Sequence, residues 1–378
     1  MSTEATAATP AADETADETA DVLVVEDLTV SFPTDDGLVQ AVRGVSYRLR
    51  EREILGIVGE SGSGKSVTSM AIMGLLPRSA RITGSIRFRG QELLGLREKE
   101  LNRFRGSKIA MIFQDPMTSL NPVHTIGYQV AEAIRAHNDV PKAQARRRAV
   151  ELLDAVGIPN PGQRVDSYPH ELSGGVRQRV VIAIAMANRP DVIIADEPTT
   201  ALDVTVQSQV LDALRTARQE TGAAMVLITH DLGVVAGQAD RVLVMYAGKP
   251  VEIGDVEDIY YRPRMPYTLG LLGSVPRLDA SRSQRLLPIL GSPPSLLNLP
   301  AGCPFTPRCP IAQDWCETEE PVLMDATSPR HSAACHFSEN LAGVRPHDLY
   351  APTSADARTP DRPDRPPAEA PTGKGNLP

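Results

Sequence analysis

The chain has 378 residues, 42% hydrophobic and 23% charged, a composition typical of a globular protein with one large domain and an appendix. No apolar run approaches the roughly 18 residues that cross a bilayer, and the N-terminus lacks a secretory signal, so we expect any membrane role to depend on docking onto other subunits. Much of the net charge of −8 lies in residues 1–21, and the nearly neutral remainder argues against nucleic acid as a partner.

Residues 22–265 alternate between short apolar runs and helical patterns. Each run has the length of a buried strand, and the runs are Val22–Val25, Ile54–Val58, Ile109–Phe113, Val192–Ala195, Met225–Thr229 and Arg241–Tyr246. Helical stretches such as Gly64–Leu76 and Val206–Glu220 separate these runs. We therefore predict an α/β domain whose largely parallel sheet is covered by helices.

Other regions differ in composition from this pattern. Strand signals are missing between about residues 125 and 188, which predicts an inserted helical subdomain. Residues 266–338 combine prolines and the four cysteines, so we expect a small, loop-rich extension with little core of its own. Residues 1–21 are acidic and residues 339–378 are rich in proline, and we expect both to be disordered tails. The apolar pieces of the extension are short, Leu286–Leu290 and Leu296–Leu299.

A glycine-rich loop follows the predicted strand Ile54–Val58 and opens a helix. Its sequence is that of a P-loop, Gly59-Glu60-Ser61-Gly62-Ser63-Gly64-Lys65-Ser66. Glycine lets the backbone N–H groups wrap the β-phosphate of a nucleoside triphosphate at a helix N-terminus, where the helix dipole favours anions. We expect Lys65 to contact the β- and γ-phosphates, Ser66 to bind Mg²⁺, and Val67 to complete the nucleotide-binding segment.

Two acidic residues end the predicted strand Val192–Ala195. Asp196 is suited to hold Mg²⁺ through its water shell, and Glu197 is suited to activate the attacking water as a general base. An acidic pair after an apolar strand is often only a helix cap, but the accompanying P-loop favours a site that hydrolyses ATP.

The stretch Leu172-Ser173-Gly174-Gly175-Val176-Arg177-Gln178-Arg179 resembles the signature motif of ABC transporter ATPases. The resemblance extends over roughly residues 22–338 and implies an ABC-type P-loop NTPase with a mixed sheet core and a helical subdomain. It also implies that Ser173, Gly174 and Gly175 contact, in trans, the γ-phosphate bound by a second ATPase subunit. Val176 stands where the family has glutamine, which puts a side-chain role at that position in doubt.

Further family landmarks follow in the expected order. Gln114 corresponds to the Q-loop glutamine, a ligand of Mg²⁺ and water, and His230 to the switch histidine that contacts the γ-phosphate. Asp203, in Ala201-Leu202-Asp203, corresponds to the D-loop at the dimer interface, and Phe32 to the aromatic that stacks on adenine. The resemblance thus implies a catalytic set of Lys65, Gln114, Glu197 and His230, with Ser66, Gln114 and Asp196 around Mg²⁺.

Three stretches resemble the dipeptide/oligopeptide importer branch of the family, namely those around Phe113–Pro122, Tyr168–Gly175 and Thr199–Gln207. The branch implies ATP hydrolysis coupled to peptide uptake at the cytoplasmic face of the cell membrane. The implied partners are a second ATPase subunit (a paralogue or a second copy), two transmembrane permease subunits and an extracytoplasmic substrate-binding protein. Nickel, glutathione or a sugar stays open as the substrate, and a non-transport ABC ATPase is a weaker alternative.

Four cysteines are confined to the extension, at Cys303, Cys309, Cys316 and Cys335. Thiols gathered in a proline-rich segment of a protein without a secretory signal suggest one tetrathiolate metal site that staples the extension, with His331 and His336 as spare zinc ligands. The spacing fits neither common zinc ribbons nor bacterial ferredoxins. The region resembles the C-terminal extension of oligopeptide/dipeptide transporter ATPases, which implies one [4Fe-4S] cluster; zinc or metal-free buried thiols are the alternatives.

Overall fold

The computed structural model describes residues 20–200, 202–275 and 287–350. The predicted tails therefore lie largely outside the described residues, as does Ala201 of the D-loop. Within the described ranges no helix is long and apolar enough to cross a membrane.

An eight-stranded sheet forms the centre of the molecule. Its strands lie in the order β11 (Met324–Ser328), β12 (His331–Ala333), β10 (Lys249–Asp255), β9 (Arg241–Tyr246), β3 (Ile54–Val58), β8 (Ala224–Thr229), β7 (Val192–Asp196) and β6 (Ile109–Ile112). The five strands from β9 to β6 are parallel, whereas β10, β12 and β11 are antiparallel additions. The parallel strands are those predicted from apolar runs, because a strand buried on both faces needs apolar residues throughout.

A second, four-stranded antiparallel sheet packs below the first in the order β2 (Gly37–Arg50), β1 (Asp21–Thr34), β4 (Arg81–Phe88) and β5 (Gln91–Glu92). The apolar run Val22–Val25 predicted only the beginning of β1. Strand β2 and the end of β4 alternate buried with partly or fully exposed residues, and both residues of β5 are exposed, so no apolar run predicts these strands. Helix α1 (Lys65–Ile72) contacts β1, β2 and β7, so the P-loop lies between the two sheets.

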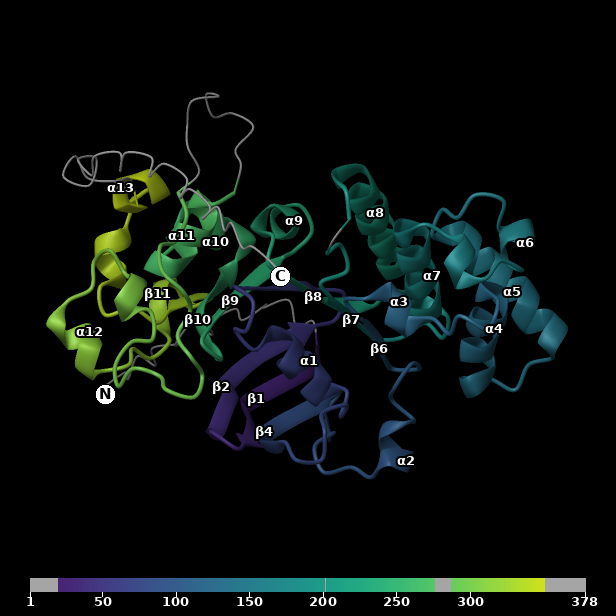
Figure 1. The fold of residues 1–378 in the computed structure, drawn as a ribbon, viewed down its shortest axis with the longest axis horizontal. Coiled ribbons are helices and arrows are strands. Elements are labelled where there is room, and N and C mark those ends of the chain that lie inside the picture. The colour runs from purple at the N-terminus through teal and green to yellow at the C-terminus, as the bar shows by residue number, and fades with distance from the viewer. Residues whose placement is uncertain (1–19, 201, 276–286, 351–378) are drawn as a thin grey trace, which may run out of the picture.

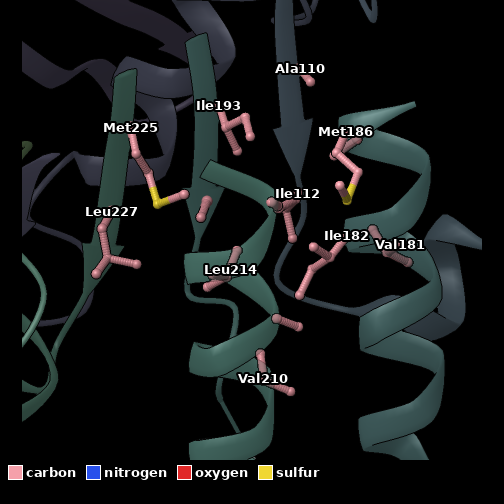
Figure 2. Close-up of a cluster of buried hydrophobic side chains, with 14 of the residues drawn as sticks. Ala110, Ile112, Val181, Ile182, Met186, Ile193, Val210, Leu214, Met225 and Leu227 are labelled. Carbon is pink, nitrogen blue, oxygen red and sulfur yellow. The ribbon is translucent and has the colours of Figure 1, made fainter. Parts of the chain in front are cut away.

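The helices between β6 and β7 lie together at one end of the molecule (Figure 1). They are α3 (Pro116–Ser119), α4 (Ile126–His137), α5 (Lys142–Ala155), α6 (Pro161–Arg164), η1 (Pro169–Glu171) and α7 (Gly174–Met186). Helix α7 and helix α8 (Val204–Thr221) place Ile182 and Leu214 among the buried side chains of β6, β7 and β8 (Figure 2). The helical stretch is thus anchored to β6, the strand at one edge of the central sheet.

The chain after β9 builds the opposite end of the molecule (Figure 1). Strand β12 pairs with β10, so the extension joins the central sheet. The prediction of a disordered tail from residue 339 is wrong up to Tyr350, whose hydroxyl donates to the Pro266 carbonyl at 2.8 Å. The other helices of the protein are α2 (Glu98–Leu101), which precedes β6, and α9 (Leu232–Ala236), α10 (Val256–Tyr261), α11 (Pro266–Gly273), η2 (Thr306–Arg308), α12 (Asp314–Thr318), η3 (Ser338–Leu341) and α13 (Pro346–Tyr350).

Candidate functional site

The P-loop has a backbone conformation that only glycine adopts readily. Gly62 and Gly64 have φ of 80° and 100°. A Cβ at Gly64 would lie 2.5 Å from the Ala41 carbonyl oxygen of β2, so this position also leaves no space for a side chain. Gly64 caps α1, whose free N–H groups face the loop. The loop is therefore a preformed cradle for an anion.

Lys65 is buried under this loop at 4% exposure. Its Nζ donates to the carbonyl oxygens of Gly59 at 2.7 Å and Glu60 at 2.9 Å. Burial lowers the pKa of Lys65, while the nearby carboxylates of Glu197, Asp196 and Glu60 act in the opposite direction. A buried ammonium whose hydrogen bonds end on neutral carbonyls fits the charge of a polyphosphate.

Ser66 and Asp196 form the adjoining part of the site. The Ser66 hydroxyl donates to Oδ1 of Asp196 at 2.9 Å. Burial raises the pKa of the Asp196 carboxyl, although the Ser66 hydrogen bond partly opposes the shift. A buried carboxylate beside a hydroxyl is the oxygen-rich setting that a hydrated Mg²⁺ prefers, so the residues present fit the predicted ion.

One carboxylate oxygen of Glu197 contacts two of the predicted catalytic residues, Gln114 and His230, and a third residue, Thr200, that was not predicted. This oxygen, Oε2, accepts hydrogen bonds from Gln114 Nε2 at 3.0 Å and Thr200 Oγ1 at 2.8 Å, and His230 Nδ1 lies 3.5 Å away. The backbone of Glu197 has φ of 45°, a left-handed conformation that is unfavourable for a residue with a side chain. Such a conformation persists where surrounding contacts hold it, and it is frequent at active sites.

One open cleft of about 920 Å³ contains this arrangement. Most of the predicted nucleotide and catalytic residues line it, namely Phe32, Gly59, Ser61, Gly62, Gly64, Lys65, Ser66, Val67, Gln114, Glu197 and His230. Ser63 and Asp196 are instead buried beneath its floor. The structure therefore brings together residues that the sequence separates into five segments.

The predicted trans-acting residues lie elsewhere. Ser173, Gly174 and Asp203 are exposed at the N-termini of α7 and α8 and are not among the described residues that line the cleft. Gly175 is buried, and a Cβ on it would lie 2.1 Å from Val206 Cγ1. This glycine thus has a packing role within the chain.

One wall of the cleft was not predicted from the sequence. The cleft is also lined by Leu271, Ser274, Pro288, Ile289 and Leu296, which belong to α11 and the segments that follow it. Three of them, Pro288, Ile289 and Leu296, fall in the apolar pieces noted in the sequence, but no local pattern indicates that those pieces face a nucleotide site. Thr200 was also missed, because a threonine after Glu197 has no distinctive spacing.

All four cysteines line one small pocket in the extension, together with Phe305, Ile311 and other apolar groups. Burial raises the pKa of Cys309 to about 12 and that of Cys335 to about 11. Across the described ranges, no three or more His, Cys, Asp or Glu side chains are arranged to hold a metal ion, so the predicted metal staple, whether an iron–sulfur cluster or zinc, is not shown. His331, predicted as a spare zinc ligand, instead pairs with Glu252 at 2.8 Å. His336 lines the cysteine pocket, and its Nε2 lies 3.0 Å from the Glu319 carbonyl oxygen.

Comparison with known proteins agrees with this geometry. The profile of the ABC transporter family matches residues 42–200, and that of the oligopeptide/dipeptide transporter C-terminal region matches residues 251–316. The oligopeptide transport ATP-binding protein OppD of Mycobacterium tuberculosis is 59% identical over 330 residues, which cover 87% of this chain and 54% of that protein. This chain therefore spans about half the length of its mycobacterial relative.

A dipeptide transport relative matches over nearly its whole length. DppD of Bacillus subtilis is 53% identical over 323 residues, which cover 85% of this chain and 96% of that protein. A solved dimer of the ATP-binding cassette MJ0796, bound to ADP and phosphate after hydrolysis, is 27% identical and has a TM-score of 0.56 over 62% of this chain and 98% of that one. The predicted ABC-type α/β fold is thus confirmed.

Proposed function

Because this chain belongs to the family of ATP-binding proteins of oligopeptide and dipeptide ABC transporters, we propose that it is the ATP-hydrolysing subunit of a membrane importer for di- or oligopeptides. The convergence of Gln114, Thr200 and His230 on the Glu197 carboxylate beside the P-loop carries this proposal. Such an arrangement orients a carboxylate toward an attacking water, which is what ATP hydrolysis requires of a general base.

The residues of the cleft divide the work of binding and hydrolysis. Lys65 and the P-loop N–H groups hold the β- and γ-phosphates, and Phe32 supplies a flat face for adenine. Ser66, Asp196 and Gln114 hold Mg²⁺, which when bound neutralises phosphate charge. Glu197 accepts the proton of the attacking water, and His230, which is exposed and lies beside Glu197, contacts the γ-phosphate of the bound nucleotide.

A second ATPase subunit completes the working unit. Ser173, Gly174 and Asp203 are exposed and lie outside the cleft of their own chain, which favours contact with the nucleotide of a partner. Their position at helix N-termini suits an anion. The partner is a paralogue or a second copy, and the dimeric state of MJ0796 supports such pairing.

Exposed apolar side chains near Gln114 favour docking onto permease subunits. Met117, Val123 and Tyr128 are 56%, 70% and 49% exposed, and Tyr168 is 39% exposed. Met117, Val123 and Tyr128 belong to the segment that leads from Gln114 into the helical subdomain. Tyr168 follows Ser167, whose carbonyl accepts a hydrogen bond from the Ile126 N–H of that segment at 2.9 Å. An exposed apolar patch of this kind is typical of a protein interface. Docking there would place the subunit at the cytoplasmic face of the membrane, with two permease subunits and an extracytoplasmic substrate-binding protein as further partners.

Two experiments test the proposal. Co-expression with candidate permease subunits should yield a membrane complex whose ATPase activity and peptide uptake depend on Glu197. Glu197→Gln should lower turnover by about 10²- to 10⁴-fold while ATP still binds. Glu220→Gln, an exposed carboxamide change on α8, is the matched control and should leave turnover unchanged. Turnover of Glu197→Gln at the wild-type rate would refute the role of Glu197.

Uptake assays with peptides, nickel, glutathione and sugars identify the substrate class. If the complex takes up nickel, glutathione or a sugar but no peptide, the proposed ATPase role stands and the proposed peptide substrate is wrong. Tight binding to DNA or ribosomes, with no binding to permease subunits, would favour a non-transport ABC ATPase instead.

The cysteine pocket is a further part of the proposal. We infer that Cys303, Cys309, Cys316 and Cys335 hold one [4Fe-4S] cluster, which when bound would cross-link four separate segments of the extension. The four thiols line one small, largely apolar pocket, and this shared lining supports the proposal. Anaerobic purification should give a brown protein with iron and sulfide in equal amounts. Stoichiometric zinc, or no metal at all, would refute the cluster.

A further inference from the structure

An ion pair joins the P-loop to the cysteine-bearing extension. Arg308 donates through Nη1 to Glu60 Oε2 at 2.6 Å and through Nη2 to Glu60 Oε1 at 2.9 Å. The Arg308 side chain is only 4% exposed. A bidentate pair between a buried guanidinium and a carboxylate fixes both the position and the orientation of its partners. Glu60 is the second residue of the P-loop, and Arg308 immediately precedes Cys309.

The same region holds the backbone of the P-loop. The Glu60 N–H donates to the Tyr267 hydroxyl at 2.8 Å. Tyr267 is fully buried and packs against Tyr246 and Phe305, with ring centroids 4.6 and 5.4 Å away. Residue 60 of the P-loop is therefore held through its side chain by Arg308 and through its backbone by this aromatic cluster.

Arg308 also holds the cleft wall. Its Nε donates to the Leu290 carbonyl at 3.1 Å, next to Ile289, which lines the cleft. One guanidinium thus contacts both the P-loop, at Glu60, and the segment that forms the cleft wall, at Leu290. Hydrogen bonding to Glu60 raises the pKa of Arg308, so the side chain remains a cation at any pH of interest.

The charge of Glu60 makes this contact important for nucleotide binding. The negative charge of Glu60 acts to raise the pKa of the nearby Lys65. The same charge would repel the phosphates of ATP if Glu60 were unpaired. Arg308 neutralises that carboxylate from behind the loop. Without Arg308 the loop would keep its negative charge and lose a positional restraint.

We propose that Arg308 is a positioning residue for ATP, through which the C-terminal extension neutralises and orients the P-loop at Glu60 and holds the cleft wall at Leu290. The inference rests on the proposed ATPase function and deepens it. It makes the extension a part of the nucleotide site and assigns it a role beyond stabilising the fold.

Paired charge-removing variants of the full-length protein test the proposal, with the dissociation constant of Mg-ATP measured by calorimetry. Arg308→Gln should raise it by about tenfold or more, because an unpaired Glu60 then faces the phosphates. Glu60→Gln should leave the dissociation constant unchanged or lower it, because an unpaired Arg308 attracts the phosphates of ATP. The double variant should recover much of the affinity lost in Arg308→Gln. In steady-state assays Arg308→Gln should raise KM for ATP more than it lowers kcat.

These outcomes separate positioning from a merely structural role. Both single variants break the same ion pair, so a purely structural role predicts weaker binding in both. Arg43→Gln is the matched control, because Arg43 also joins the nucleotide-binding domain to the extension: its Nη2 lies 2.9 Å from Glu320 Oε2. This variant should leave the dissociation constant of Mg-ATP unchanged. Equal weakening in the two single variants, or a change in Arg308→Gln below about twofold, overturns the proposal. Failure of the wild-type protein to bind ATP would refute the proposed function instead.

Discussion

Two adjacent glycines of the signature motif should respond very differently to the same substitution. A Cβ on Gly175 would lie 2.1 Å from Val206 Cγ1, whereas a Cβ on Gly174 would lie 3.7 Å from Leu202 Cδ2, an ordinary contact. Both residues occupy the first turn of α7, so alanine changes the helix propensity similarly at both. The difference in stability between Gly175→Ala and Gly174→Ala therefore isolates the clash with Val206.

The size of that difference follows from how Val206 can move. Valine has few χ1 rotamers in a helix, so α8 itself must shift to accommodate an extra methyl group. Overpacking of this kind costs about 1–3 kcal/mol, which lowers the melting temperature of a domain of this size by about 2–12 °C. We expect Gly175→Ala to melt lower than Gly174→Ala by that amount.

Thermal unfolding followed by circular dichroism measures the difference. The double variant Gly175→Ala/Val206→Ala removes the clashing Cγ1 and should recover part of the lost stability relative to Val206→Ala alone. Gly174→Ala should fold normally but lose ATPase activity if its exposed surface serves a partner's nucleotide. Equal melting temperatures for Gly174→Ala and Gly175→Ala would refute the packing role assigned to Gly175.

Three further substitutions probe other parts of the site. Asp196→Asn should raise the melting temperature of the nucleotide-free protein at pH 7, because the folded-state pKa of Asp196 is raised and its ionised form disfavours folding. That gain should shrink as the pH falls through the raised folded-state pKa of Asp196 toward the ordinary range of an aspartate, and melts at pH 7 and at acidic pH check the sign. Thr200→Val should lower kcat by about tenfold with little change in ATP affinity, since it removes the 2.8 Å hydrogen bond to Glu197; steady-state kinetics beside binding assays measure the two effects. Phe305→Ala should cost about 3–5 kcal/mol in urea unfolding, because its ring is 1% exposed and packs on Tyr246 and Tyr267.

The parts of the fold predicted from the sequence are those whose pattern is local. Strands β3 and β9 have the predicted bounds, Ile54–Val58 and Arg241–Tyr246, because strands buried on both faces are apolar throughout. The antiparallel sheet was missed beyond its first residues. In β2, buried Val45, Tyr47 and Leu49 alternate with partly or fully exposed Arg48 and Arg50, a pattern that resembles an ordinary surface segment.

The candidate site divides in the same way. The P-loop and the Asp196–Glu197 pair could be predicted because each lies within a short segment whose spacing reflects its chemistry. The hydrogen bond from Thr200 and the left-handed backbone at Glu197 could not, since both depend on how neighbouring strands end. The cleft wall at Ile289 was missed for a similar reason, because apolar residues in a loop-rich segment do not indicate which surface they cover.

The link between Arg308 and Glu60 lies furthest from prediction. The two residues are 248 positions apart, and no sequence pattern around either residue predicts its contact with the other. Strand β12 brings them together indirectly, because its pairing with β10 fixes the extension against the edge of the central sheet. The extension is therefore built into the nucleotide-binding fold, and substitutions that loosen it, such as Phe305→Ala, should reach the P-loop through Tyr267 and Arg308. Weaker ATP binding in Phe305→Ala at a temperature where the protein remains folded would demonstrate that connection, and unchanged binding would contradict it.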